Sequence, residues 1–522
     1  AVETLRSRKY REDKPFAIMC RDIEEVRSHC RVSPYEEELL LAVERPIVIL
    51  PRERNGKIAR SVAPYQNTLG VMLPYTPLHH LLLSGPLKAL VMTSGNISDE
   101  PIAFKNGQAK EKLSSIADYF LLHNREIYTR CDDSVLMAFQ KKPIFFRRSR
   151  GYTPYPIKMP SSSGMILACG GELKNTFCLT KGHYAFMSHY IGDLENLETL
   201  NAFEEGIEHF KRIFQIKPEV LAYDLHPDYL STKYALSQEG IVKIGVQHHH
   251  AHVAACMADN GIDGDVIGVA FDGTGYGSDG TLWGGEFLKA SYEGFIRKGH
   301  LKPIQLPGGE KAIREPWRIV GAYLYRIFGD EFTYLDIPFN HRLSHEKWTI
   351  LKKMLDHFIN TPLSSSIGRL FDAVSSLLGI RDVVRYEGQA AIELETIANG
   401  RGSMAYPFPI LERDGISILD PDEMINGIVN DLMTGEPSSS ISTKFHKSIG
   451  NAILGMCRKI REEEGLNRVV LTGGVFQNRF LLKLAWRLLK DHDFEIYIHH
   501  QVPPNDGGLS LGQVMIAGRM MK

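Results

Sequence analysis

Four histidines within five residues, HHHAH at 248–252, are the clearest chemical signal in the chain. His248 and His252 are four positions apart, so on a helix they share one face and can bind the same ion. Asp272 ends an apolar segment, and Asp506 follows another one. Because the carboxyl ends of strands converge on one crevice in a doubly wound sheet, these four residues can meet despite their separation. Two imidazoles with two carboxylates suit iron or zinc better than calcium or magnesium.

A cluster of core or surface histidines is the competing interpretation of this motif. For a generic histidine pair it would be the better one, because a motif remains a hypothesis until its context supports it. The aspartates at the matching strand ends favour the metal site here. Asp224 also ends an apolar segment, and we leave it unassigned.

A second signal is the glycine pair in LTGGVFQNRF, residues 471–480. A turn through Gly473 and Gly474 lets bare backbone approach a nucleotide, and a helix that follows offers its first N–H groups to anionic oxygens. PPNDGG, residues 503–508, adds another glycine turn after an apolar segment. Each pair alone is more typical of a structural turn. Their joint placement favours a nucleotide cleft.

Cations and hydroxyl groups cluster in the N-terminal third of the chain. The segments concerned are RSRKYREDKPFA (6–17), TSGN (93–96), DDSV (132–135) and RRSRGY (147–152). Such a set can hold a triphosphate and an attached acyl group. A solvated basic face explains the composition equally well, since charge runs usually lie on surfaces.

The elements that must position these groups alternate between strand and helix, which predicts an α/β architecture. The first third has apolar strand candidates at 16–19, 47–50 and 90–92. Beyond it, the pattern predicts strands at 220–224, 241–247, 266–272 and 468–471 and helices at 197–214, 248–261, 367–378 and 480–488. The proline- and serine-rich stretch 152–164 separates the two parts and is typical of an interdomain linker.

Two glycine-rich stretches, 167–180 and 266–288, resemble one another: each has an apolar strand, a glycine turn and a returning strand. A duplicated nucleotide-binding architecture explains the likeness. Coincidence is the alternative, because glycine marks turns in every fold.

Length and composition exclude several classes of protein. The 522 residues are enough for two to four domains, and 61 basic against 62 acidic residues leave no global field for nucleic acid or an anionic membrane. No apolar stretch approaches the ~20 residues of a spanning helix. The seven cysteines are scattered without a CxxC pair, which is typical of buried thiols in the cytoplasm and not of a disulfide or zinc framework. The start at Ala1, without a signal peptide, indicates a fragment of a longer chain.

Taken together, the motifs resemble the HypF family of carbamoyltransferases over nearly the whole chain. KPFAIM, TSGNISDEPI, CDDSV and RRSRGYTP are similar to the YrdC-like domain of that family. GGELKNTF, HYIGDLEN, HPDYLST, VQHHHAHVAA, FDGTGYGSDGTLWGGEF, SSIGRLFDAVSSLLGI, YEGQAA, LTGGVFQN and PPNDGGLSLGQ are similar to its transferase domain. No stretch resembles the acylphosphatase domain or the zinc-finger motifs of the family, and the YrdC-like domain looks truncated at its N-terminus.

The resemblance implies an α/β fold in which a YrdC-like domain precedes a duplicated actin-like (ASKHA) ATPase-type domain. The expected boundaries are 1–158 for the first, 159–164 for a linker and 165–522 for the second. It also implies that the chain uses ATP, with Mg²⁺, and carbamoyl phosphate or carbamate to form carbamoyl adenylate. The carbamoyl group would then pass to the C-terminal cysteine thiol of HypE, for the cyanide ligands of [NiFe]-hydrogenases.

Three alternatives stay open beside this function. An O-carbamoyltransferase acting on a small-molecule hydroxyl uses the same chemistry, but its relatives carry the two domains in the opposite order. A fusion protein for tRNA threonylcarbamoylation is disfavoured by the neutral charge and the histidine-rich motif. A non-catalytic scaffold for hydrogenase maturation would keep only nucleotide binding.

The resemblance also assigns site residues by motif. The metal ligands, to iron or zinc, would be His248, His252, Asp272 and Asp506. The nucleotide of the transferase domain would lie near Gly473, Gly474 and Asn478. The adenylation pocket would comprise Lys9, Arg11, Lys14, Thr93, Ser94, Asn96, Ser134, Arg148 and Arg150. No cysteine falls at a catalytic position in these motifs, so no enzyme nucleophile is nominated, and transfer directly to the partner's thiol is expected.

Overall fold

The computed structural model describes residues 1–97, 100–402 and 404–521. They form two compact units, which are described one at a time. The first comprises Ala1–Val246, Ala258–Gly261 and His499–Lys522, and the second comprises Gln247–Met257 and Ile262–Ile498. Both units are α/β, as expected.

The first unit begins with a six-stranded mixed sheet in the order β4-β1-β3-β2-β5-β6. Its strands are β1 (Ala17–Cys20), β2 (Ile47–Pro51), β3 (Thr68–Met72), β4 (Ala89–Met92), β5 (Val135–Phe139) and β6 (Lys142–Arg147). The helices of this part are α1 (Val2–Arg8), α2 (Ile23–Arg27), α3 (Pro34–Leu41), α4 (Pro77–Leu83) and α5 (Asn106–Leu113), with a 3-10 turn η1 (Arg60–Val62). The three expected strands are confirmed as β1, β2 and β4. Each of these strands consists of an apolar run. Buried side chains of the sheet, such as Val48, Leu50 and Val71, pack together in one hydrophobic core.

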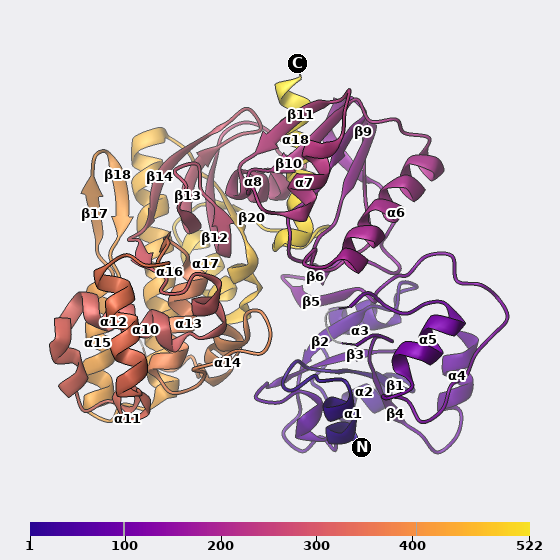
Figure 1. The fold of residues 1–522 in the computed structure, drawn as a ribbon, viewed down its shortest axis with the longest axis horizontal. Coiled ribbons are helices and arrows are strands. Elements are labelled where there is room, and N and C mark those ends of the chain that lie inside the picture. The colour runs from indigo at the N-terminus through magenta and orange to yellow at the C-terminus, as the bar shows by residue number, and fades with distance from the viewer. Residues whose placement is uncertain (98–99, 403, 522) are drawn as a thin grey trace. The chain divides into compact units, whose positions relative to one another are not determined.

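A second sheet completes the first unit, in the order β11-β10-β8-β9-β7. Its strands are β7 (Ile157–Ser163), β8 (Ile166–Ala168), β9 (Cys178–Met187), β10 (Val220–Asp224) and β11 (Val242–Val246). Its helices are α6 (Leu197–Phe214), α7 (Leu230–Ser237) and the C-terminal α18 (Leu509–Met520), which follows the 3-10 turn η4 (Asp506–Gly508). Helix α18 packs on β7, β8, β9 and β10, so the end of the chain joins a sheet formed more than 250 residues earlier (Figure 1).

The expected linker at 159–164 is wrong, because these residues belong largely to strand β7. This strand pairs antiparallel with β9 and forms the edge of its sheet. Proline is compatible with an edge strand, where its missing N–H costs no ladder bond. The register shifts between Lys158 and Ser163, around Pro160. Prolines and serines that indicated a flexible connection therefore mark an irregular edge strand.

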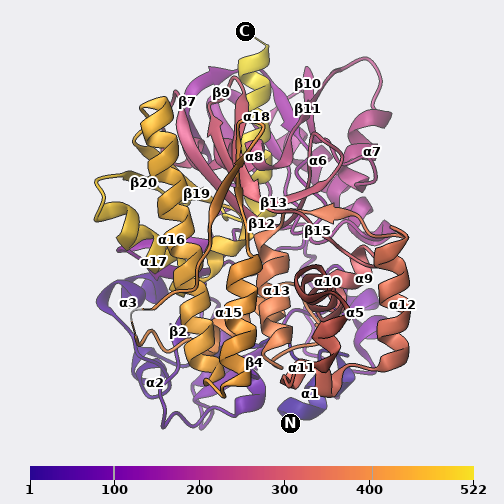
Figure 2. The ribbon, with the colours of Figure 1, turned by 90° about the vertical axis from the view of Figure 1, so that its left-hand side faces the viewer.

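The second unit is built on a nine-stranded sheet whose main path is β17-β18-β14-β13-β12-β19-β20. The strands are β12 (Val266–Tyr276), β13 (Leu282–Ala290), β14 (Phe295–Leu301), β15 (Ile304–Gln305), β16 (Leu363–Ser364), β17 (Ile410–Arg413), β18 (Ile416–Leu419), β19 (Arg468–Thr472) and β20 (Glu495–Tyr497). The helices are α8 (His248–Asp259), whose last two residues group with the first unit, α9 (Glu310–Arg314), α10 (Trp317–Phe328), α11 (Pro338–Arg342), α12 (His345–Asp356), α13 (Ile367–Leu377), α14 (Gln389–Ile397), α15 (Asp422–Met433), α16 (Ser438–Glu464) and α17 (Arg479–Lys490). Two 3-10 turns are η2 (Gly329–Tyr334) and η3 (Gly474–Gln477). Helices α15 and α16 run side by side (Figure 2).

The second and third sheets share one topology, which confirms the expected duplication. In one the order is β7-β9-β8-β10-β11, and in the other its counterpart is β14-β13-β12-β19-β20. In both, a central strand (β8 or β12) pairs antiparallel with the next strand and parallel with a later one, which in turn pairs parallel with the last. The strands beyond the antiparallel partner differ, because β7 precedes β8 in the chain whereas β14 follows β13. Coincidence in turn chemistry would not reproduce this whole order of pairing, so the duplicated actin-like architecture stands.

Candidate functional site

The histidine pair lies in the first turns of α8, which begins two residues after the end of β11. His248 and His252 are fully buried, and their ring centroids are 5.0 Å apart. Their Nε2 atoms lie 3.5 and 3.7 Å from the same oxygen, Oδ2 of Asp272. The expected shared face of the helix is therefore confirmed, and it is turned toward the aspartate.

The carboxylate of Asp272 is held in a fixed orientation within β12. The backbone N–H of Gly474 donates to Oδ1 at 2.9 Å, which leaves Oδ2 facing the histidines. Burial alone would raise the pKa of Asp272, but hydrogen bonds and charges of His248 and His252 hold that pKa well below its usual range. The carboxylate thus stays ionised at neutral pH, as a metal ligand must.

The donor set fits a transition-metal ion. His248, His252 and Asp272 each offer an atom within 4.8 Å of the others. Two imidazoles and a carboxylate, buried and converging, suit iron or zinc. Asp506 begins η4 in the other unit, where Asn505 caps the turn by accepting the Gly507 N–H at 3.0 Å. Its share in the same ion site stays a prediction.

The other two histidines of the motif are used differently. The Nε2 atom of His250 lies 2.6 Å from the carbonyl of Ser291. His249 packs 6.0 Å from the ring of Trp283, and its Nδ1 lies 3.3 Å from the side-chain amide of Gln247. Burial and the neighbouring His248 lower the pKa of His249 well below its ordinary value, so this ring is neutral. His248 and His252 are the histidines of the motif that face Asp272 in the described part of the chain, as the i, i+4 argument for the pair predicts.

Two glycines make the close packing at this centre possible. A Cβ atom on Gly275 would lie 2.6 Å from Cδ2 of His248, so any side chain there would displace the ring. Gly473 has a φ of 96°, and a Cβ atom on it would lie 2.1 Å from the carbonyl oxygen of Phe271. The glycines of FDGTGYG and LTGG therefore let β12, α8 and the turn after β19 meet.

The residues expected near the nucleotide have structural partners as well. The N–H of Gly474 is taken by Asp272. Asn478 caps α17 by accepting the Leu481 N–H at 2.8 Å, and its Nδ2 lies 3.0 Å from Nε2 of His446. Gly473, Gly474 and Asn478 thus shape the turn beside Asp272, and their contact with a nucleotide stays a prediction.

Beside the N-terminal sheet, the structure brings together three of the residues expected in the adenylation pocket: Lys9 at the end of α1, and Ser94 and Asn96 after β4. The Lys9 ammonium donates to the carbonyls of Ser94 and Asn96 at 2.8 and 2.6 Å. The Ser94 hydroxyl donates to Oδ1 of Asn96 at 2.7 Å. Burial, with a smaller effect of the Arg11 charge, lowers the pKa of Lys9 to about 8. The hydroxyl of Thr93, which precedes Ser94, is buried and has no hydrogen-bond partner among the described residues.

The loop that carries Lys9, Arg11 and Lys14 is organised by a residue that our sequence analysis missed. The guanidinium of Arg6 is 7% exposed and donates to the carbonyls of Arg11, Glu12, Lys14, Ser61 and Val62. Arg11 itself donates to the carbonyls of Lys14 and Pro15 at 3.1 and 2.5 Å. One arginine among several in RSRKYRED gave no signal of this role, because the spacing of charges does not reveal which one is buried.

Among the described residues, Ser134, Arg148 and Arg150 bond to partners outside the Lys9 cluster. Ser134 donates to the Arg150 carbonyl at 2.9 Å and accepts from the Ser149 N–H. Arg148 donates to the carbonyls of Tyr152 and Tyr155, and burial lowers its pKa to about 10. Arg150 donates to Asp133 and to two carbonyls, and it lies over the Tyr75 ring. Both arginines therefore support local structure, and their place in the pocket stays a prediction.

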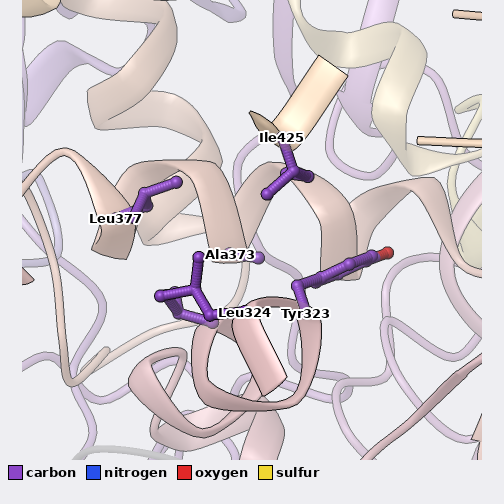
Figure 3. Close-up of a pocket in the computed structure, with 6 residues that line it drawn as sticks. Tyr323, Leu324, Ala373, Leu377 and Ile425 are labelled. Atoms are coloured by element: carbon purple, nitrogen blue, oxygen red, sulfur yellow. The ribbon is translucent and has the colours of Figure 1, made fainter. Parts of the chain in front are cut away.

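A small apolar gap in the second unit is not a candidate site. It has an empty volume of about 170 Å³, is too narrow for water, and is lined by Val320, Tyr323, Leu324, Ala373, Leu377 and Ile425 (Figure 3). Nothing in its lining offers the charges that a nucleotide requires.

Other sequence expectations concern cysteines and membrane segments. The seven cysteines are all free thiols, and all except Cys131 are buried. Among the described helices, none has both the length and the apolar character needed to cross a membrane.

Family models match nearly the whole chain. Residues 1–149 match the model described as "Telomere recombination" (Sua5/YciO/YrdC). Residues 161–259 match the "HypF Kae1-like domain", and residues 268–513 match "Carbamoyltransferase, Kae1-like Domain, second subdomain".

Curated proteins and solved structures give the same likeness. Carbamoyltransferase HypF of Synechocystis sp. is 39% identical over 99% of this chain and 68% of its own length. HypF2 of Cupriavidus necator is 40% identical over 99% of the chain and 69% of its own length. A crystal structure of full-length HypF in the phosphate- and nucleotide-bound form superposes with a TM-score of 0.96 at 47% identity, covering 100% of this chain and 81% of that one. The crystal structure of T. kodakarensis HypF has a TM-score of 0.93 at 34% identity, covering 100% and 69%.

Proposed function

The chain belongs to the HypF family of carbamoyltransferases, and we propose that it makes carbamoyl adenylate from ATP and passes the carbamoyl group to the C-terminal cysteine of HypE. This reaction would supply the precursor of the cyanide ligands of [NiFe]-hydrogenases. A nucleotide-bound relative of the same fold supports the use of ATP. We place the activity in the cytoplasm, an assignment that the free cysteines support.

We assign adenylation to residues 1–158. A carbamate oxygen attacks the α-phosphorus of ATP, a new P–O bond forms, and pyrophosphate leaves with the electrons of the broken P–O bond. The side chains that would bind the phosphates and the acyl group are those around Lys9, Ser94 and Asn96, with Arg11 and Lys14 on the loop that Arg6 holds. A buried ammonium beside the phosphates neutralises charge that develops on the leaving pyrophosphate. Mg²⁺ would accompany the ATP.

We assign transfer to residues 165–522. The sulfur of the partner's cysteine attacks the carbamoyl carbon, the bond from that carbon to the adenylate oxygen breaks, and AMP leaves while the thiol proton goes to solvent or phosphate. His248, His252, Asp272 and, in the proposal, Asp506 would hold an iron or zinc ion. Such an ion supplies Lewis acidity that makes AMP a better leaving group. The chain's own residues hold the carboxylate ionised and the histidines in one orientation.

Direct transfer to the partner is supported by the state of the cysteines. Six of the seven are buried, and burial raises the pKa of Cys20, Cys30 and Cys169 to about 12. Such thiols are poor nucleophiles at neutral pH. Partial desolvation of the Cys131 sulfur, which lies 3.4 Å from the Ser149 hydroxyl, also raises the pKa of that thiol. A covalent carbamoyl-enzyme on cysteine is therefore disfavoured.

The observation that carries the proposal is the buried triad of His248, His252 and Asp272 within a chain of this family. The test is to incubate the protein with ATP, carbamoyl phosphate or carbamate, and HypE, and to read the intact mass of HypE. The expected product is HypE heavier by one carbamoyl group on its last cysteine, formed together with AMP. Unmodified HypE, with a carbamoylated small-molecule hydroxyl instead, would favour the O-carbamoyltransferase alternative.

A further inference from the structure

A buried arginine on α13 has hydrogen-bonding capacity that the described protein does not use. The side chain of Arg369 is 6% exposed and pairs with Asp372, whose Oδ2 lies 3.0 Å from Nη2. Its Nε and Nη1 atoms are buried and have no hydrogen-bond partner among the described residues. Buried guanidinium donors are normally satisfied, because an unmet charged donor costs free energy.

Arg369 lies directly beside the metal-binding strand. The Ser366 hydroxyl, which caps α13, contacts the carbonyls of Asp272 and Gly273, both at 2.7 Å. A Cβ atom on Gly273 would lie 3.4 Å from Nη2 of Arg369. The guanidinium is therefore packed against the residue that follows Asp272.

The charges around this point favour an anionic ligand held by a cation. Asp372 is buried beside Arg369 and pairs with Nη2 alone, at 3.0 Å. A guanidinium with free donors binds phosphate oxygens in a planar, directional way. The helix dipole of the eleven-residue α13, whose first turn carries Arg369, acts in the same sense.

We propose that Arg369 binds a phosphate oxygen of the adenine nucleotide in the transferase site. This inference rests on the proposed function, since it needs an adenylate at this centre. It adds a residue that the glycine-turn argument does not provide, because the Gly474 N–H already serves Asp272. Arg369 would bind the phosphate of the carbamoyl adenylate. It would keep this contact while the bond from the carbamoyl carbon to the phosphate oxygen breaks and AMP forms. Asp372 holds the guanidinium in place.

The test compares AMP with adenosine, which lacks the phosphate. Binding is measured by calorimetry on the full chain carrying Lys9→Met, so that the adenylation pocket contributes little. Arg369→Gln should weaken AMP binding by about 10- to 100-fold and leave adenosine binding unchanged within about twofold. The AMP affinity of Arg369→Lys should lie between those of the parent and Arg369→Gln. Lysine keeps the positive charge but lacks the paired N–H donors of the guanidinium.

Asp372 provides a second variant that separates ligand binding from folding. Asp372→Asn removes the ion pair that holds the guanidinium but keeps the positive charge, so AMP binding should weaken clearly less than in Arg369→Gln, and adenosine binding should stay unchanged within about twofold. The double variant Arg369→Gln/Asp372→Asn leaves no buried carboxylate without its partner and should still lose AMP selectively. Arg381→Gln is the matched control, since it removes an arginine paired with Glu393 at 2.7 Å in the same unit. It should leave the ratio of AMP to adenosine affinity unchanged.

Several outcomes would overturn the inference. Equal loss of AMP and adenosine in Arg369→Gln, or loss of AMP in Asp372→Asn to the same degree, would show a structural role. If Arg369→Gln keeps AMP binding and instead raises the KM for HypE, the guanidinium binds the partner's carboxylate. If the parent binds AMP and Arg369→Gln binds it equally, the inference fails while the proposed function stands. A parent that binds no AMP at all would overturn both.

Discussion

The histidine–aspartate centre and the basic N-terminal loop use their charged groups in opposite ways. At the centre, His248, His252 and Asp272 lie on a helix and a strand and face one another. In the loop, Arg6 and Arg11 donate mainly to main-chain carbonyls of the loop itself. The first arrangement concentrates ligand atoms at one point, and the second fixes the path of the backbone in the loop.

The difference shows how to separate a ligand-binding charge from a structural one. A cation whose donors are filled by carbonyls, such as Arg6 or Arg148, mainly positions the backbone. A buried cation with donors left over, such as Arg369, has capacity for a ligand. Sequence composition treats these arginines alike, whereas their hydrogen bonds distinguish them.

The largest effect should follow from breaking the centre. His248→Ala removes one imidazole, so carbamoyl transfer to HypE should fall by at least about 1000-fold. Transfer is measured by the mass of HypE, and bound iron and zinc by elemental analysis. His250→Gln is the matched control, because Nε2 of His250 lies 2.6 Å from the Ser291 carbonyl and is not one of the proposed ligands. This variant should transfer the carbamoyl group at a rate near that of the parent. Equal loss in both variants would mean that the pair has no special role.

A second prediction sharpens the comparison at the loop. The lowered pKa of Lys9, about 8, means that its positive charge is lost as the pH rises through that value. The kcat/KM for ATP in pyrophosphate exchange should therefore fall above pH 8. Lys9→Met should lower the exchange by about 100-fold and remove this limb of the pH profile. A profile that keeps the same limb in Lys9→Met would assign it to another group.

A smaller effect is expected when the loop loses its anchor. Arg6→Met leaves five carbonyls without their donor and should destabilise the chain by about 3 kcal/mol, measured by denaturant unfolding. The KM for ATP should rise by about tenfold, because Lys9, Arg11 and Lys14 lose their common position. Arg6→Lys should recover part of both losses. An unchanged KM in a destabilised Arg6→Met would show that the loop does not position the pocket.

The smallest effect on transfer should come from removing a single hydrogen bond between strand β19 and helix α8. The Thr472 hydroxyl donates to the carbonyl of His252 at 3.1 Å, which ties β19 to α8. Thr472→Val keeps the shape and should cost about 1 kcal/mol of unfolding free energy. Transfer should change by less than about threefold, since the strand and helix remain in place. A loss as large as that of His248→Ala would contradict the view that these elements position the centre collectively.

The elements that could be predicted from the sequence are those in which apolar residues recur at the regular spacing of a strand or a helix. The strand expected at 220–224 is β10 to the residue, and the helix expected at 197–214 is α6. The strand expected to end at Asp272 continues to Tyr276, because the hairpin with β13 extends it past the ligand. Periodicity on a helix also placed His248 and His252 on one face.

The parts that were not predictable depend on burial and on contacts distant in sequence. The expected linker is edge strand β7, because an edge tolerates the prolines and serines that a linker also carries. Arg6 went unnoticed among neighbouring arginines, and Arg369 lies within an apolar helix whose core face dominates its pattern. Arg148 and Arg150 were assigned to the adenylation pocket by motif, and that assignment stays a prediction; their bonds to Asp133 and to main-chain carbonyls could not be read from the sequence.

The most direct measurement is ATP–pyrophosphate exchange by His248→Ala, followed in the same sample as the mass of HypE. Separate centres for the two half-reactions predict carbamate-dependent exchange close to that of the unaltered protein, with HypE left unmodified. Loss of exchange together with transfer, in a variant shown to be folded, would mean that the histidine pair serves both steps and that the division between the two centres is wrong.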